Sequence, residues 1–241
     1  MQLLDLTLPT AAENLALDEA LLDLGDDDPA APELLRLWEC PEYAAILGRS
    51  GKVAEEVDAA RCELEKVPIL RRVSGGGTVL IGPGCLMYSL RLSYQQRPHL
   101  RLLDQAHLEV LSSTAQALNR LLSGSSIELR GTSDLALNDL KISGNSLRCK
   151  RNHLLYHGTL LYDFDLPRVQ RLLKSPPRQP EYRGQREHRD FVVNLPLDSA
   201  SLKAALISAW QATEMIADWP REQMQQCLQQ RYLQRKWNCE R

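Results

Sequence analysis

Residues 71–80 read RRVSGGGTVL, so two arginines and a serine precede three consecutive glycines, and two β-branched residues follow them. Three adjacent glycines are costly to order, because glycine loses more backbone freedom on folding than any other residue. Such a loop is useful where a ligand approaches the backbone closely or where φ is positive, and its N–H groups can bind an anion. A guanidinium is well shaped to bind a phosphate or carboxylate. We therefore interpret the segment as a cradle for an acyl or phosphate group, with a glycine-rich hairpin that carries two solvated arginines as the alternative.

Composition narrows the class of protein. The 241 residues are 44% hydrophobic and carry a net charge of −2, which fits a globular chain of one large domain and gives no general attraction to nucleic acid or anionic lipid. No apolar run approaches the ~20 residues that a membrane span needs, and the N-terminus lacks the basic region of a signal peptide. The six cysteines form no C-x-x-C pair, which argues against a zinc ribbon. We expect a cytoplasmic protein with free thiols and with neither nucleic acid nor membrane as a partner.

Hydrophobic spacing predicts the secondary structure. Helices are expected over residues 13–24, 55–66, 107–122, 167–173, 198–216 and 221–232. Strands are expected over residues 34–38, 43–48, 67–73, 78–81, 85–92, 126–130, 134–137, 140–143 and 154–162. We expect hairpins over 34–48 and 78–92, and a Pro/Arg-rich loop over 175–189. Because strands outnumber βαβ units, the predicted class is α+β, with a mixed, largely antiparallel central sheet flanked by helices.

Three further segments carry candidate chemistry. Lys141 precedes a turn of small residues and could reach a phosphate or carbonyl, although spacing alone favours an edge-strand lysine. His157-Gly158 interrupts an apolar strand, and a glycine there indicates close approach of a ligand or of another backbone. A core histidine beside a β-bulge is an equally supported interpretation. The arginine-rich stretch 168–189 could complete an anion site or meet an acidic protein, whereas a solvated loop is the commoner outcome for such a run.

Taken in order, these motifs resemble those of the lipoate–protein ligase A family, within the biotin/lipoate A/B protein ligase superfamily that also contains lipoyl and octanoyl transferases. Residues 14–19 (NLALDE) are similar to the family's N-terminal helix, and residues 46–49 with 55–58 are similar to its Gly-Arg…Glu-Val-Asn segment. Residues 71–79 match its Arg-Arg-x-Ser-Gly-Gly-Gly-x-Val signature. The later matches are Lys-Ile-x-Gly-Asn at 141–145, His-Gly-Thr-Leu-Leu at 157–161, and an Arg-x-x-Val-x-Asn-Leu element that ends at Leu195.

The resemblance implies a fold of the biotin/lipoate ligase catalytic-domain type and an ATP-dependent reaction. Such ligases convert lipoate or octanoate to an acyl-adenylate, with Mg²⁺, and pass the acyl group to a lysine of a lipoyl carrier domain or a glycine-cleavage H-type protein. Lys141 would be the catalytic residue, in contact with the α-phosphate and the acyl carbonyl. Nucleotide and acyl group would be bound by Arg71, Arg72, Ser74, Gly75, Gly76, Gly77, Thr78, Val79, Leu80, Gly144, Asn145, His157, Gly158 and Asn194.

Some features depart from the family pattern and leave alternatives. Ile81 stands where many of these ligases have a histidine, and Ser50-Gly51 stands where they have Gln-Asn. We expect residues 1–241 to form a single catalytic domain without a C-terminal accessory domain, which a separate protein could supply. One alternative is a cysteine-dependent acyl transferase that uses a carrier thioester without ATP, for which Cys85 and Cys149 are the nearest thiols. The other is a non-catalytic module that binds a lipoyl carrier.

Overall fold

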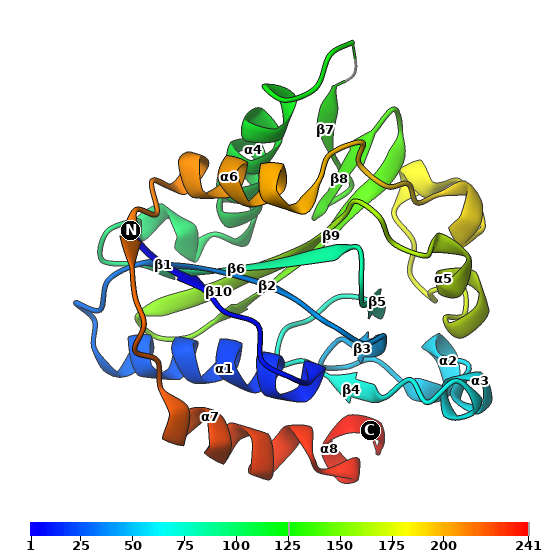
Figure 1. Ribbon diagram of the computed structural model, residues 1–241, viewed down its shortest axis with the longest axis horizontal. Helices are drawn as coiled ribbons and strands as arrows, with labels where there is room; N and C mark the ends of the chain where they lie inside the picture. Colours follow the sequence, from blue (N-terminus) through cyan, green and yellow to red (C-terminus); the bar gives the residue numbers. More distant parts are fainter. Residues whose placement is uncertain (125, 241) are drawn as a thin grey trace.

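The computed structural model describes residues 1–124 and 126–240, in which helices cover both faces of a central mixed sheet (Figure 1). This large sheet has eight strands in the order β11-β1-β2-β6-β10-β9-β8-β7. Strand β1 pairs in parallel with β2 and β11, and the other neighbours are antiparallel. The predicted α+β class is confirmed. The strands are β1 (Gln2–Asp5), β2 (Leu34–Glu39), β6 (Cys85–Ser93), β7 (Ile127–Arg130), β8 (Asp134–Leu137), β9 (Leu140–Cys149), β10 (His153–Leu161) and β11 (Glu214–Met215).

The two faces of the large sheet pack against different helices. Helix α1 (Ala11–Asp27), with α7 (Arg221–Cys227) and α8 (Arg235–Cys239), lies on one side, and α4 (Leu103–Asn119) with α6 (Ser199–Trp210) lies on the other (Figure 1). Strand β6 serves both cores because successive side chains point to opposite faces. Leu86 and Tyr88 pack in the core of α4 and α6, whereas Cys85 and Met87 pack in the core of α1.

A second sheet of three strands corrects the two predicted hairpins. Its order is β4 (Ile69–Arg71), β3 (Ala44–Leu47) and β5 (Val79–Ile81). Strands β2 and β3 therefore belong to different sheets, as do β5 and β6, and the hairpins expected over 34–48 and 78–92 are wrong. At the second crossing Gly84 has φ +81°, and a Cβ there would lie 2.1 Å from the carbonyl carbon of Asp163. The strand segments were detectable from their composition, but their partners are set by long-range contacts.

Several predicted helices end or divide at identifiable residues. The helix expected over 55–66 is two short helices, α2 (Val53–Glu56) and α3 (Ala59–Leu64), because the Asp58 carboxylate caps the second by accepting from the Arg61 N–H. The helix expected over 198–216 ends at Gln211, whose φ of +49° is left-handed. The chain then continues into β11 beside β1. The remaining helical turns are α5 (Leu166–Leu172), a π-turn (Leu228–Tyr232), and 3₁₀ turns at Pro98–Arg101, Glu181–Arg183 and His188–Asp190.

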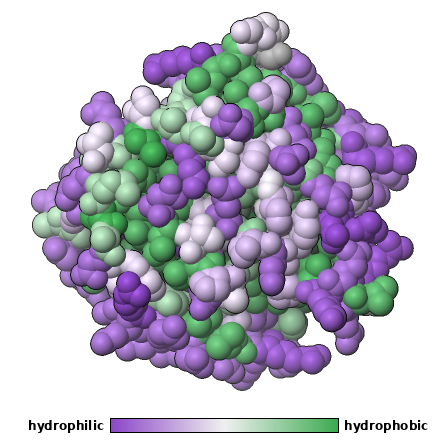
Figure 2. Space-filling view, in the orientation of Figure 1, coloured by the Kyte–Doolittle hydropathy of each residue, from purple (hydrophilic) through white to green (hydrophobic). Residues whose placement is uncertain are grey.

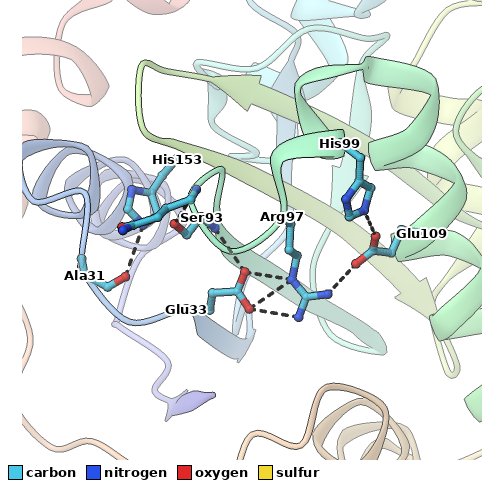
Figure 3. A network of polar contacts seen from close by, with 8 residues as sticks. Ala31, Glu33, Ser93, Arg97, His99, Glu109 and His153 are labelled. Atoms are coloured by element: carbon cyan, nitrogen blue, oxygen red, sulfur yellow. Dashed lines mark hydrogen bonds and ion pairs between the residues drawn. The ribbon is translucent and has the colours of Figure 1, made fainter.

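A network of charged residues lies at the C-terminal end of β6, which is the end farther from the glycine loop (Figure 3). Arg97 contacts Glu33 at 2.9 Å and Glu109 of α4 at 2.5 Å, and His99 contacts the other oxygen of Glu109. Its guanidinium also lies over the ring of Trp210 in α6. The network thus joins both helices of this face to β6.

The surface shown in Figure 2 is hydrophilic around its rim, with hydrophobic residues gathered in smaller areas between. Exposed large hydrophobic side chains include Leu102 and Leu103 at the start of α4. Across the described residues, no helix combines the length and apolar character needed to cross a membrane.

Candidate active site

A cavity of about 480 Å³ collects most of the candidate residues. Its walls come from the glycine-rich loop, from β9 and β10 of the large sheet, and from the Pro/Arg-rich loop before the last helices. The structure brings together here the candidates Arg72, Gly76, Gly77, Thr78, Val79, Leu80, Lys141, Gly144, Asn145, His157 and Gly158. Segments separated by more than a hundred residues therefore face a common space.

Arg72 shapes the glycine-rich loop from within. Its guanidinium donates to the carbonyls of Ile46 (3.1 Å), Gly75 (2.5 Å) and Gly77 (2.9 Å), and it is 7% exposed. Burial lowers the pKa of Arg72 to about 10, so the side chain stays protonated at neutral pH. Between the bonded carbonyls, Gly76 adopts φ +84°, a backbone conformation that residues other than glycine rarely adopt. Arg72 thus fixes the loop from within, and because Arg71 and Arg72 are both buried, the alternative of a hairpin with two solvated arginines is wrong.

Glu56 accepts a hydrogen bond from a backbone N–H of the glycine-rich segment. It is not among the site residues predicted from the motifs. The buried carboxylate accepts from the Thr78 backbone N–H at 2.9 Å and from the Thr78 hydroxyl at 2.8 Å. Its other oxygen accepts from the Lys52 backbone N–H at 3.2 Å. The glycine loop is therefore held by a cation on one side and by a carboxylate on the other.

Lys141 faces the cavity in an ion pair. Its Nζ lies 2.7 Å from Oδ1 of Asp134, and the Tyr182 hydroxyl donates to the other carboxylate oxygen at 2.8 Å. A Cβ at Gly144 would lie 3.0 Å from Nζ, so the glycine leaves room for the ammonium group. Lys141 pairs with Ala136 of β8 on one side and forms a bridge with Val192 on the other, so the alternative of an edge-strand lysine is wrong. Asp134 and Tyr182 carry no local signal of this pairing, because they are distant from each other in sequence.

His157 is a neutral histidine at the cavity wall. Its Nε2 lies 2.5 Å from Oγ of Ser74, and that oxygen accepts from Nε of Arg72 at 3.0 Å. The Ser74 hydroxyl therefore links the Arg72 guanidinium to the His157 ring. Burial, with the nearby Arg72 charge, lowers the pKa of His157 to about 4. At Gly158 a Cβ would lie 1.8 Å from Oδ1 of Asn145, so the glycine allows a close side-chain approach in a regularly paired strand, and no bulge is present there.

We predict that mild acid destabilises the protein through His157. Its folded-state pKa lies below the ordinary value of 6.5, so the unfolded chain binds more protons once the pH falls below about 6.5. The contribution of neutral His157 to the free energy of unfolding is fully present above that pH. It falls by up to roughly 3 kcal/mol as the pH approaches 4. Urea unfolding at several pH values should show this decline, and His157→Gln, which can still accept from Ser74, should flatten it. An equal decline in the variant would assign the effect to other groups.

Four predicted site residues do not line the cavity. Ser74 and Gly75 lie just behind it in the loop, bonded as described above. Arg71 points to the opposite side from Arg72, because successive side chains of a strand alternate. Its guanidinium donates to Gly51 O at 2.6 Å and to Trp237 O at 2.8 Å, next to α8. Asn194 bonds both backbone groups of Phe164. The bonds of Arg71 and Asn194 therefore position backbone outside the cavity lining.

Neither of the two candidate cysteines lines the cavity. Cys85 is fully buried, which raises its pKa, and Cys149 is not among the residues that form the cavity wall. Within residues 1–124 and 126–240, the group of potential metal ligands that lies within 4.8 Å of one another is Glu19, Asp23 and Cys227. It lies outside the cavity lining, and Lys150 and Arg231 already pair with its carboxylates.

The sequence matches a family of known proteins over most of its length. Residues 10–207 match the family described as the lipoyl protein ligase A/B catalytic domain. Lipoate–protein ligase 1 of Staphylococcus aureus is 29% identical over 191 residues, which are 79% of this chain and 54% of that protein. The chain spans about half the length of the curated relatives it matches.

Two solved structures share the fold. One is a bipartite lipoate protein ligase of Thermoplasma acidophilum, solved in a study with its E2 lipoyl domain (TM-score 0.83, 21% identity, 98% of this chain and 95% of that chain). The other is a lipoate–protein ligase A bound with ATP (TM-score 0.80, 21% identity, 98% and 97%). At this level of identity the likeness establishes the fold alone.

Proposed function

The chain belongs to the lipoyl protein ligase A/B catalytic domain family, and from this premise we propose that it is an ATP-dependent lipoate–protein ligase. It would activate lipoate or octanoate as an acyl-adenylate and acylate a lysine of a carrier protein. One observation carries the proposal: the Lys141 ammonium faces the same cavity as the Arg72-bonded glycine loop. A fixed cation beside a cradle of backbone groups is what an adenylate requires, because the adenylate combines a phosphate with a mixed anhydride.

The proposed reaction has two steps. In the first, a carboxylate oxygen of the acyl substrate bonds to the α-phosphorus of ATP, and the bond to the pyrophosphate oxygen breaks. In the second, the neutral amine of the carrier lysine attacks the acyl carbon, the carbon–oxygen bond to the phosphate breaks, and AMP leaves with that electron pair. Lys141 would stabilise the negative charge that develops on the phosphate and acyl oxygens in both steps. Positioning and charge stabilisation suffice, so a protein nucleophile is not needed.

The lining suggests how the two substrates would divide the cavity. Met87, Leu161 and Phe164 line the cavity and belong to one hydrophobic cluster, and the neutral His157 lines it as well. An aliphatic acyl chain would bind there, between Gly76 and Gly158, because a neutral, apolar wall adds no charge near the hydrocarbon. The nucleotide would bind along residues 77–80, with Gly144 and Asn145 on the opposite strand. The presence of these residues in the cavity lining supports this division.

Mg²⁺ would enter with the nucleotide. The two carboxylates that line the cavity are both engaged, Glu56 with Thr78 and Asp134 with Lys141. Mg²⁺ is commonly held by one or two carboxylates together with substrate phosphates and water, so this lining fits an ion delivered by ATP better than a preformed protein cage. Bound there, Mg²⁺ would neutralise phosphate charge.

The acceptor would be a lipoyl carrier. The bipartite Thermoplasma ligase was studied with its E2 lipoyl domain, which supports a lipoyl domain as acceptor here, and a glycine-cleavage H-type protein is the other candidate. We further propose that residues 1–241 act as one catalytic domain in the cytoplasm, with an accessory protein as a possible second component. Assays with and without such a protein address the last point.

The proposal predicts that ATP and free lipoate together acylate a lipoyl domain. Intact-protein mass spectrometry of the carrier gives the measurement, with omission of ATP and replacement of the acceptor lysine as controls. Because no thioester forms, Cys85→Ser and Cys149→Ser should each retain most of the activity. Acylation from an acyl-carrier thioester without ATP, lost in Cys149→Ser, would favour the transferase instead. Carrier binding without acylation from either donor would indicate a non-catalytic module.

A further inference from the structure

Arg183 is a buried cation without an acidic partner. It is 3% exposed, and it lies in the 3₁₀ turn Glu181–Arg183 of the Pro/Arg-rich loop. Its side chain makes one hydrogen bond, from Nε to the Arg186 carbonyl at 2.9 Å. Its Nη2 is buried and has no hydrogen-bond partner among the described residues. Within residues 1–124 and 126–240, no carboxylate forms an ion pair with its guanidinium. The side chain lines the cavity.

Contacts within the loop fix the orientation of the Arg183 guanidinium. The guanidinium lies 4.7 Å from the centre of the Phe191 ring, and Arg186 returns a bond from its own Nε to the Arg183 carbonyl at 2.9 Å. Phe191 in turn accepts the backbone N–H of Lys141 at 2.8 Å. Arg183 and Lys141 are therefore positioned by the same short segment. A buried charge without a partner costs stability, and a rigid support for one indicates that a ligand supplies the opposite charge.

The surrounding charges leave a positive excess. The cavity is lined by five cationic side chains, Arg72, Lys141, Lys174, Arg178 and Arg183, against the carboxylates of Glu56 and Asp134. Arg186, beside Arg183, contacts Asp139 at 3.6 Å, and the Tyr182 hydroxyl is bonded to Asp134. His188, which also lines the cavity, has its pKa lowered by burial and by the charges of Arg183 and Lys141. An anion with several charges would balance this wall, whereas a single carboxylate would not.

We infer that Arg183 binds the β- and γ-phosphates of ATP and holds the pyrophosphate that leaves. The inference rests on the proposed function for the identity of the nucleotide, but the anion site itself is assigned from the side chain. A guanidinium can donate to two phosphate oxygens at once. When the acyl carboxylate bonds to the α-phosphorus, the bridging oxygen leaves with the electron pair of the broken bond. Arg183 receives that charge while Lys141 stays with the adenylate.

Isothermal titration calorimetry with inorganic pyrophosphate, ATP and AMP tests the inference without any acyl substrate or carrier. The variants are Arg183→Gln and a matched control, Arg189→Gln, which removes the same charge from the same loop at a side chain 69% exposed. Arg183→Gln should weaken pyrophosphate and ATP by at least about tenfold and leave AMP within about twofold, since the guanidinium bonds to charged oxygens are strong ones. Arg189→Gln should bind all three ligands as the wild type does.

Thermal unfolding without ligand separates a binding role from a structural one. Because Arg183→Gln removes a buried charge without a partner, its melting temperature should equal or exceed that of the wild type. A lower melting temperature, with AMP and ATP weakened by the same factor, would make Arg183 only a support for the loop. Unchanged pyrophosphate binding in Arg183→Gln, or no pyrophosphate binding by the wild type, would also overturn the inference. Arginine-dependent pyrophosphate binding in a protein that fails to acylate a carrier would keep the site and reject the ligase.

Discussion

Replacing Lys141 by alanine should lower the single-turnover rate of adenylate formation by ~10²–10³-fold, the usual loss when one preorganised stabiliser of developing charge is removed. The lysine side chain is only 25% exposed and its Nζ is already held 2.7 Å from Asp134, so little reorganisation is needed before it contacts a phosphate. Lys141→Arg should not restore the rate. A planar guanidinium needs more room than an ammonium, and the space beside Gly144 is filled by the lysine itself.

The ion pair means that this variant also affects folding. With Lys141 removed, the Asp134 carboxylate, 9% exposed, keeps only the Tyr182 hydroxyl, and leaving such a group unpaired costs about 1–3 kcal/mol or more. Adding Asp134→Asn to Lys141→Ala should recover stability, because an amide carries no charge, while the adenylation rate stays low. Rates and melting temperatures measured for the single and double variants separate the two effects. An alanine variant that forms adenylate at nearly the wild-type rate would mean that Lys141 acts only through this ion pair.

Replacing Arg36 by methionine should destabilise the protein by about 3–5 kcal/mol, because it leaves a buried carboxylate without its cation. Arg36 is fully buried in β2 and contacts Oδ1 of Asp18 in α1 at 2.6 Å. The same guanidinium donates to Oδ1 of Asn14 at 2.6 Å, and Ser89 of β6 donates to Asp18 at 2.8 Å. The cluster therefore joins the first helix to strands β2 and β6.

Urea unfolding gives the measurement for Arg36→Met. The double variant Asp18→Asn with Arg36→Met should recover much of the loss, because neither side chain is then charged. As a matched surface control, Lys52→Met removes the cation of an exposed ion pair with Glu55 and should change stability by less than about 1 kcal/mol. A loss in Arg36→Met no larger than that of the control would show that water or another group compensates Asp18.

The Arg36 cluster also gives the N-terminal motif a physical role. Asn14 and Asp18 belong to the segment NLALDE, which resembles the N-terminal helix of the ligase family. In the structure Asn14 and Asp18 bond to Arg36, and Asp18 also accepts from Ser89, which pairs in register with His157 on the neighbouring strand. The motif supports the strand that carries His157 and does not line the cavity itself.

Local features of the sequence were sufficient for the class of fold, most elements and the centre of the site. The spacing of hydrophobic residues indicates a helix or strand from one segment of sequence. The glycines at 76, 144 and 158 likewise stand out in the sequence, and the structure shows that a Cβ has no room there or that φ is positive. The motifs led to Arg72, Lys141 and His157, which the structure brings to one cavity.

Only the tertiary structure decided which strands pair and which charges meet. Two expected hairpins divide between two sheets, and Arg71 and Arg72, adjacent in sequence, point to opposite sides. Asp134 and Arg183 line the cavity, and Tyr182 donates to Asp134, because the Pro/Arg-rich loop folds against β8. Pairing and burial depend on residues far apart in the chain, and a charge is unusual only when its surroundings are known, so neither property can be read from neighbouring residues.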